Sequence, residues 1–315
     1  MSIAAYLRLF VPVQRARWSI AICRGASLTG LKPVAPAPAL TRSDVPGVRV
    51  HGVADPFLIR HQGRWLLFFE IENADTGRGE IALARSTDLI QWDFGGVVLR
   101  EPFHLSYPHV FEHEGAWYMV PESVAAQSVH LYRADSFPTG WRLHAQLLQG
   151  DLADATPFQH ERRWWIMAVR GYGTTDELVL FHAESLAGPW HPHALNPVLA
   201  GDRRKSRPAG RVVRDGAQLI RFAQDCETNY GRAVRAYAID ELTPSQYREH
   251  TLNGDVPILA ASGHGWNATG MHHIDAGQVA PGEWVAASDG RETVTHWPIL
   301  DKVAARWGRH ARSAR

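Results

Sequence analysis

Carboxylic acids recur in this sequence beside prolines and at the ends of apolar runs. Asp55 stands directly before Pro56, Asp154 stands shortly before Pro157, and Glu122 ends an apolar stretch. Cleavage of an acetal needs such groups, because one must deliver a proton to the leaving oxygen and another must activate water. Two carboxyl groups in one enclosed site repel each other, so their pKa values separate into an acid and a base. We interpret Asp55 as the base and Glu122 or Asp154 as the acid.

Other polar side chains at comparable positions are candidates for binding substrate. Arginine can hold a carboxylate or phosphate through two parallel hydrogen bonds, and aromatic rings can stack on a sugar. The substrate-binding candidates are Glu70, Tyr107, His109, Arg207, Asp225, His272 and His273. Further polar residues expected at the same place, with no assigned role, are Glu72, Arg170, Gln224, Asp275 and Asp289.

Structural explanations exist for several of these residues. An Asp before a proline is a common turn device that accepts hydrogen bonds from backbone amides. Arg207 could simply pair with a carboxylate on the axis, and His272 and His273 could be packed core residues. The recurring tryptophans, such as Trp65, are interpreted as core.

The elements that position these residues repeat along the chain. An apolar run, a short polar turn and a second apolar run recur after the prolines at 56, 108, 157 and 208, which are 52, 49 and 51 residues apart. A fifth copy begins at His272. Each of the first three copies is followed by a second strand-like pair, so each unit has about four short strands. A four-stranded unit of this period is typical of a propeller blade.

We therefore predict an all-β fold, a five-bladed β-propeller closed by an N-terminal strand. The last copy is short of four strands, and the alternating segment 18–23 can supply the missing outer one, which removes an exposed edge. The predicted organisation is an N-terminal extension over 1–17, a single propeller over 18–295 and a basic tail over 296–315. In a blade the innermost strand begins at the face where the second strand ends. The candidate residues are therefore expected to gather at one mouth of the axis.

Composition narrows the function classes. The chain has 315 residues, with 33 Lys and Arg against 32 Asp and Glu, so a nucleic-acid partner is not expected. Cys23 and Cys226 are interpreted as free buried thiols. No apolar run is long enough to span a membrane, and we expect a non-secreted, cytoplasmic protein.

Several short strings together carry a resemblance to known proteins. They are Ala54-Asp55-Pro56-Phe57, Ser106-Tyr107-Pro108-His109, Val120-Pro121-Glu122-Ser123, Asp154-Ala155-Thr156-Pro157, Ser206-Arg207-Pro208, Asn229-Tyr230-Gly231 and Met271-His272-His273. The pattern resembles the five-bladed propeller superfamily that includes glycoside hydrolase family 43. It is most similar to the N-terminal propeller domain of plant glucosamine inositolphosphorylceramide transferases and their bacterial stand-alone relatives.

The family 43 resemblance implies roles for some residues and departs from the family at others. Asp55 matches the family's general base, whereas His109 stands where a pKa-tuning Asp is expected. The family's acid is a Glu just ahead of a proline-containing sequence in a later blade, for which Asp154 is the nearest match and Glu122 a neighbouring candidate. No cofactor is required. Family members often hold a cation near a fifth-blade histidine, so a structural cation beside His272 or His273 is left open.

Two functions are compatible with these residues. The first is a glycosidase-like enzyme that acts on a sugar or glycoconjugate. The second is a non-catalytic glycan-binding propeller in polysaccharide or glycolipid biosynthesis, whose partners would be biosynthetic enzymes. In the plant transferases the resemblance places transfer in a separate C-terminal domain, so lipid glycosylation is not assigned to this chain.

Overall fold

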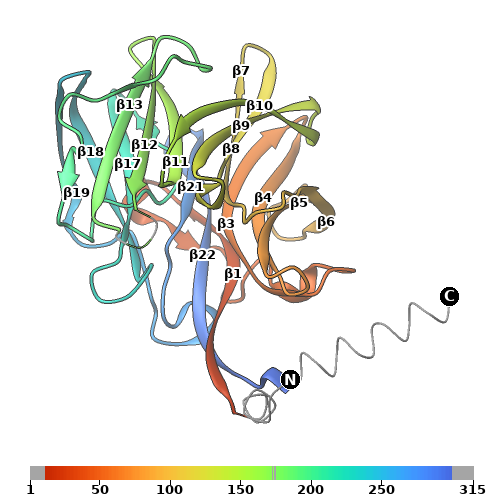
Figure 1. Cartoon of the computed structure of the whole chain (residues 1–315). Coiled ribbons are helices and arrows are strands. Elements are labelled where there is room, and N and C mark those ends of the chain that lie inside the picture. The colour runs from red at the N-terminus through yellow and green to blue at the C-terminus, as the bar shows by residue number, and fades with distance from the viewer. Residues whose placement is uncertain (1–10, 172, 174, 300–315) are drawn as a thin grey trace.

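The described residues form five antiparallel sheets arranged around an axis (Figure 1). The computed structural model describes residues 11–171, 173 and 175–299. Blade 1 contains β3 (Val50–His61), β4 (Arg64–Asn73), β5 (Arg78–Ser86) and β6 (Asp93–Leu99). Blade 2 contains β7 (Ser106–His113), β8 (Ala116–Glu122), β9 (Ser128–Ser136) and β10 (Thr139–Gln149).

The third and fourth blades have the same order, with short additional strands at the outside. Blade 3 contains β11 (Leu152–His160), β12 (Arg163–Arg170), β13 (Glu177–Ala183), β14 (His191–Pro192) and β15 (Leu199–Ala200). Blade 4 contains β16 (Val213–Asp215), β17 (Gln218–Asp225), β18 (Ala233–Thr243), β19 (Gln246–Asp255) and β20 (Leu259–Ala260). Short 3₁₀ helices lie in the connections: η2 (Leu28–Gly30), η3 (Arg42–Asp44), η4 (Val124–Ala126) and η5 (Gly265–Asn267).

The fifth blade joins the two ends of the propeller. It contains β21 (Ile274–Ala280), β22 (Glu283–His296), β1 (Val13–Gly25) and β2 (Lys32–Pro33), in that order from the axis outward. β1 and β22 run side by side in Figure 1 and pair in an antiparallel ladder. The predicted five-bladed propeller with N-terminal closure is confirmed, with β1 as the third strand of its blade and the short β2 outside it.

The hydrophobic core lies between blades, in five separate clusters. Each cluster takes residues from two neighbouring blades, for example Phe68 of blade 1 with Val110 of blade 2, and Val120 of blade 2 with Ile166 of blade 3. The remaining clusters join blades 3 and 4, blades 4 and 5, and blades 5 and 1. The ring is therefore held by burial of apolar area at every blade boundary.

The inner strands of blades 1 to 3 share one irregularity near the mouth. In each, two residues oppose one on the second strand, and the first of the two has a left-handed backbone: Asp55 (φ 51°), Tyr107 (φ 46°) and Asp154 (φ 53°). This bulge is strained for residues other than glycine. The sequence pattern aligns Pro157 of blade 3 with Pro108 of blade 2, 49 residues earlier, and this alignment is wrong. Ala155 is the residue of blade 3 that occupies the position of Pro56 and Pro108.

The ends of the chain lie partly outside this description. The predicted tail 296–315 and extension 1–17 overlap residues 300–315 and 1–10, which the structure does not describe, and these boundaries stay predictions. Among the described residues no helix has the length and apolarity to cross a membrane. Cys23 and Cys226 are both buried and free.

Candidate functional site

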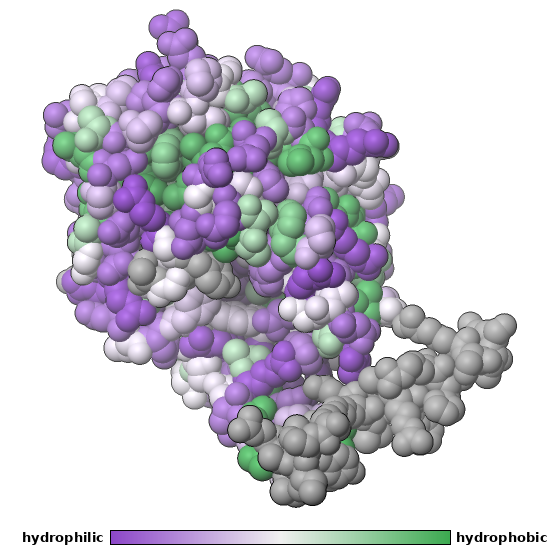
Figure 2. All heavy atoms as spheres, in the orientation of Figure 1, coloured by the Kyte–Doolittle hydropathy of each residue, from purple (hydrophilic) through white to green (hydrophobic). Residues whose placement is uncertain are grey.

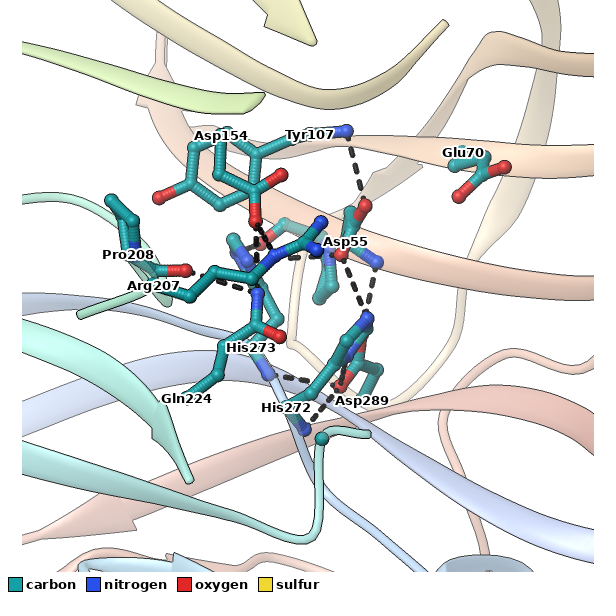
Figure 3. Close-up of polar contacts among 12 residues, drawn as sticks. Asp55, Glu70, Tyr107, Asp154, Arg207, Pro208, Gln224, His272, His273 and Asp289 are labelled. Atoms are coloured by element: carbon teal, nitrogen blue, oxygen red, sulfur yellow. Dashed lines mark hydrogen bonds and ion pairs between the residues drawn. The ribbon is translucent and has the colours of Figure 1, made fainter. Parts of the chain in front are cut away.

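Residues from all five blades meet at the mouth of the axis (Figure 3). Tyr107 connects three of the blades. Its backbone N–H donates to Asp55 Oδ2 at 3.1 Å, and its hydroxyl lies 2.8 Å from Thr156 Oγ1. The bulge thus turns equivalent residues of neighbouring blades toward one another.

Asp289 holds the fifth blade to Asp55. Its Oδ1 accepts the backbone N–H groups of His272 and His273, each at 3.1 Å, and its Oδ2 accepts the N–H of Asp55 at 3.1 Å. His272 stands between the two carboxylates, with Nδ1 2.8 Å from Asp289 and Nε2 3.5 Å from Asp55 Oδ1. The three side chains form a line from the core to the mouth.

The charges in this line set the protonation of each group. Burial opposes a charged imidazole, but Asp289 and then Asp55 raise the pKa of His272 above its usual value. Burial likewise opposes ionisation of Asp289, but His272 lowers its pKa. Burial raises the pKa of Asp55 to about 7, against the attraction of His272 and with the repulsion of Asp289. Asp55 can therefore exchange a proton near neutral pH.

Asp154 is held in an ion pair. Arg207 Nε donates to Asp154 Oδ2 at 2.6 Å, and Gln224 Nε2 donates to the same oxygen at 3.0 Å. Both ionic groups are buried. Asp154 is the nearest match to the acid that the family 43 resemblance expects, and its partner Arg207 stands directly before Pro208. A guanidinium does not release a proton at neutral pH.

Glu122 has one engaged and one unengaged oxygen. Oε1 accepts the backbone N–H of Val124 at 3.0 Å, while Oε2 is buried without a hydrogen-bond partner among the described residues. Burial, followed by repulsion from Asp154, raises the pKa of Glu122 to about 8. A protonated carboxyl with a free oxygen is thus available beside the Asp55 cluster.

Glu70 occupies the position of Glu122 in blade 1 and lies apart from the bonded cluster in Figure 3. Burial, followed by repulsion from Asp55, raises its pKa well above the usual range. His104 Nδ1 accepts the N–H of Gly79 at 2.9 Å, so the neutral ring carries its proton on Nε2, which lies 3.4 Å from Glu70 Oε1. Glu70 is therefore positioned within its own blade.

The axis beneath Asp55 is filled with rings. His109 stacks on Phe57 at 5.0 Å between ring centroids, and burial, followed by Arg211, lowers its pKa well below the usual range. His273 Nε2 donates to Pro56 O at 3.0 Å, and burial lowers the pKa of this ring to about 3. Both histidines are neutral.

Asp225 is not brought into the cluster. Its carboxylate accepts a hydrogen bond from Arg235 Nε at 3.0 Å within blade 4. Asp275 pairs with Arg211 below the rings, and Arg170 is exposed. The candidates that do meet are Asp55, Tyr107, Glu122, Asp154, Arg207, His272 and His273, with Glu70 close enough for repulsion from Asp55 and Glu122.

Two aromatic residues of the mouth had no assigned role in the sequence. Trp18 of β1 stacks on His272, with ring centroids 4.1 Å apart and an interplanar angle of 24°. Tyr230 lies edge-on to His272, has Arg207 5.1 Å from its ring centroid and is 39% exposed. Trp18 could be found only through the closure of the ring, whereas Tyr230 lies in one of the strings that carried the resemblance.

The Asp55–His272–Asp289 line also offers one ligand atom per residue, all within 4.8 Å of one another. Carboxylate and imidazole ligands suit several divalent metals. However, both ring nitrogens of His272 face carboxylates, and the oxygens of Asp289 accept backbone N–H groups. This donor set fits an imidazolium better than a metal, and the structural cation stays a prediction.

Comparison with known proteins identifies the family. The family described as "Glucosamine inositolphosphorylceramide transferase 1, N-terminal" matches residues 19–291. The chain belongs to this family. A relative from Oryza sativa subsp. japonica, glucosamine inositolphosphorylceramide transferase 1, is 38% identical over 244 residues, which cover 76% of this chain and 33% of the relative. The protein of the same name from Arabidopsis thaliana is 34% identical over 277 residues, covering 86% and 36%. The chain thus spans about a third of the length of these relatives.

Solved structures agree on the fold. An exo-β-1,3-galactanase from Clostridium thermocellum has a TM-score of 0.55 at 12% identity, covering 70% of this chain and 52% of the galactanase. The catalytic domain of a family GH62 α-L-arabinofuranosidase from Coprinopsis cinerea has a TM-score of 0.57 at 15% identity, covering 77% and 92%. At these identities the likeness shows the propeller fold alone.

Proposed function

We propose that the axial mouth binds a sugar or glycoconjugate and cleaves a glycosidic bond, with Asp55 as general base and Glu122 as general acid. The observation that carries the proposal is the buried Oε2 of Glu122, which has no hydrogen-bond partner among the described residues and belongs to the same charge cluster as Asp55. A buried carboxyl oxygen without a partner is costly, and a ligand oxygen would relieve that cost.

Glu122 is a better acid than Asp154. The carboxylate of Asp154 accepts two hydrogen bonds on one oxygen, one of them from the Arg207 guanidinium. Both of these hydrogen bonds come from protein groups, whereas Glu122 Oε2 has no hydrogen-bond partner among the described residues. We assign Asp154 and Arg207 to positioning and substrate binding, together with Tyr230 at the rim.

The reaction requires two proton movements. Glu122 donates the proton on Oε2 to the glycosidic oxygen while the bond from that oxygen to the anomeric carbon breaks. Ionised Asp55 accepts a proton from a water molecule whose oxygen attacks the anomeric carbon. Asp289 and His272 hold Asp55 in place through its backbone N–H and its carboxylate.

A second candidate function is glycan binding without turnover. It is favoured by Asp154, the nearest match to the family 43 acid, because this carboxylate is held by Arg207, a group that cannot donate a proton. The names of the relatives, which are transferases, and of the structural neighbours, which are glycoside hydrolases, support a glycan or glycolipid headgroup as ligand in either case. A binding module would serve partner enzymes of biosynthesis, and we place either activity in the cytoplasm.

The experiment is a panel of aryl glycosides with the wild type, Asp55→Asn and Glu122→Gln, accompanied by calorimetric binding of the same sugars. Removal of a general acid or base lowers turnover by about 10²–10⁴-fold. Glu112→Gln, an exposed carboxylate on the same inner hairpin of blade 2 as Glu122, serves as the control and should keep full activity. Equal activity in both mouth variants eliminates the assigned roles, and binding without turnover in the wild type selects the second function.

The pH dependence of kcat/KM tests the same assignment. Activity needs Asp55 ionised and Glu122 protonated, so the rate rises with pH through the pKa of Asp55, about 7, and falls through that of Glu122, about 8. We expect a narrow bell between these values. A profile that stays flat between pH 6 and 9 would contradict it.

A further inference from the structure

A second polar pocket lies at the opposite end of the inner strands. It has a volume of about 300 Å³ between blades 2 and 3. His113 ends β7 and Trp164 follows the first residue of β12, whereas Tyr107 and Asp154 lie at the mouth ends of the same hairpins. Six residues of extended strand separate Tyr107 from His113, roughly 20 Å. The pocket is therefore distinct from the mouth.

The equivalent tryptophans of blades 2 and 3 have different neighbours. Trp65, Trp117 and Trp164 occupy one equivalent position, at the start of the second strand. The ring of Trp117 is covered by Phe137, stacked at 3.9 Å with an interplanar angle of 12°. Trp164 is buried with its ring tilted against Phe111 at 5.6 Å between centroids, and it lines the pocket together with polar side chains such as His113.

The walls of the pocket combine rings with carboxylates and imidazoles. Tyr118 is half-buried, and its ring lies 5.7 Å from that of His144. His113 stands edge-on to Trp164 at 5.0 Å. Glu114 and Glu184, both exposed, complete the opening. A ring face suits the apolar C–H face of a sugar, while the polar groups around it can bind hydroxyls.

The charge of the walls selects among sugars. The lining residues that the structure describes include two glutamates and neither Lys nor Arg. The pocket of about 330 Å³ between blades 5 and 1 differs, since Arg60 and Arg211 line it. The pocket beside Trp164 therefore disfavours phosphate or uronic acid groups and favours a cation. Its volume is at the small end of ligand sites, which suits a single sugar residue.

We infer that the pocket between blades 2 and 3 is a second sugar site, which binds an amino sugar through the Tyr118 ring and through ion pairs of its ammonium group with Glu114 and Glu184. The inference does not rest on the proposed glycosidase activity, because none of these residues lies at the mouth. The site would hold a glycan chain on the face opposite the catalytic cluster.

The test uses the full chain and a tetramer of β-1,4-linked glucosamine, with the N-acetylated tetramer and tetragalacturonate as matched probes. We expect calorimetric binding of the glucosamine tetramer and weaker binding of the other two. Glu114→Gln with Glu184→Gln should weaken that binding about tenfold or more, and His144→Ala about threefold. Glu112→Gln should not change it. Thermal unfolding of each variant verifies that the fold is intact.

The mouth variants separate this inference from the proposed function. Asp55→Asn and Glu122→Gln should retain binding of the glucosamine tetramer even where they lose turnover. No binding to the wild type, unchanged affinity in the double glutamate variant, or loss only in the mouth variants would each overturn the second site.

Discussion

The two ends of the inner hairpins of blades 1 to 3 differ in the surroundings of their side chains. At the far end, blades 1 to 3 close with two-residue turns in which both residues have positive φ: Gln62-Gly63, Glu114-Gly115 and Glu161-Arg162. At the mouth the same strands carry bulges at Asp55, Tyr107 and Asp154. Both ends repeat a backbone shape, but the turn side chains are exposed, whereas each bulge side chain is buried and has a hydrogen-bond partner in the next blade.

The difference shows how a repeated fold can carry a single site. Equivalent backbone at Asp55, Tyr107 and Asp154 aims two carboxylates and one phenol at the axis, and each has a different partner. Because only one mouth exists, each blade can contribute a different group. The face of the molecule in Figure 2 is mostly hydrophilic, with most of its hydrophobic residues in the upper half. The few buried charged residues at the axis, among them Asp55, Asp154 and Arg207, act on one another more strongly than exposed ones do.

The largest expected effect comes from breaking the ion pair at the mouth. Asp154→Ala removes the carboxylate that accepts the Arg207 guanidinium, and the loss of one partner of a buried pair costs about 3–5 kcal/mol. Chemical denaturation should show this decrease in the free energy of unfolding. Glu161→Gln, in the exposed turn of the same hairpin, should change it by less than about 0.5 kcal/mol.

A double variant distinguishes lost pairing from lost packing. Asp154→Leu combined with Arg207→Leu leaves no buried charge of this pair and should recover much of the stability. If the single Asp154→Ala variant is as stable as the wild type, the ion pair at the mouth contributes no more to the free energy of unfolding than the exposed carboxylate in the turn does.

Glu122 gives an effect of intermediate size that depends on pH. Its pKa rises from 4.5 to about 8 on folding, so the folded state binds more protons than the unfolded state between these values. The contribution of Glu122 to stability is therefore full below pH 4.5 and declines as the pH rises toward 8. Glu122→Gln, which cannot ionise, should be more stable than the wild type by about 2–4 kcal/mol at pH 9 and nearly equal to it at pH 4.

Thermal unfolding of both proteins from pH 4 to pH 9 measures this difference. Glu112→Gln is the matched control, because the exposed carboxylate should give parallel curves. A constant difference across the range would mean that Glu122 titrates normally and is not the buried acid of the mouth.

The sequence is sufficient for the architecture. Recurring tight turns between apolar runs predict the hairpins, and a short fifth copy predicts that the N-terminal strand closes the ring. The predicted alignment of blade 3 with the other blades is wrong, because Pro157 lies at the position of Leu58 and Val110, two residues past the bulge. A bulge adds a residue without changing the apolar pattern around it, so counting prolines cannot locate it.

The site is predictable in part. Asp55, Glu122 and Asp154 meet as expected, because their positions follow from strand direction. Asp289 is placed at the mouth but given no role, since its importance lies in accepting backbone N–H groups of Asp55 and two histidines, contacts that exist only once the ring is closed. The sequence leaves the choice of acid open between Glu122 and Asp154, because the pairing of Asp154 with Arg207 joins two blades and does not follow from the repeat.

The smallest expected effect concerns the two-residue turns that connect the inner strands of blades 1 to 3. Arg162 has φ 59° at the position where the equivalent turns have Gly63 (φ 77°) and Gly115 (φ 73°). A left-handed backbone is strained for a residue with a Cβ, so Arg162→Gly should raise the free energy of unfolding by about 0.5–1 kcal/mol, less the entropy that glycine loses on folding. The reciprocal change, Gly115→Ala, should lower it by about 1 kcal/mol. Denaturation of the pair measures both, and effects of the same sign would show that the turns, unlike the bulges, are not set by backbone conformation.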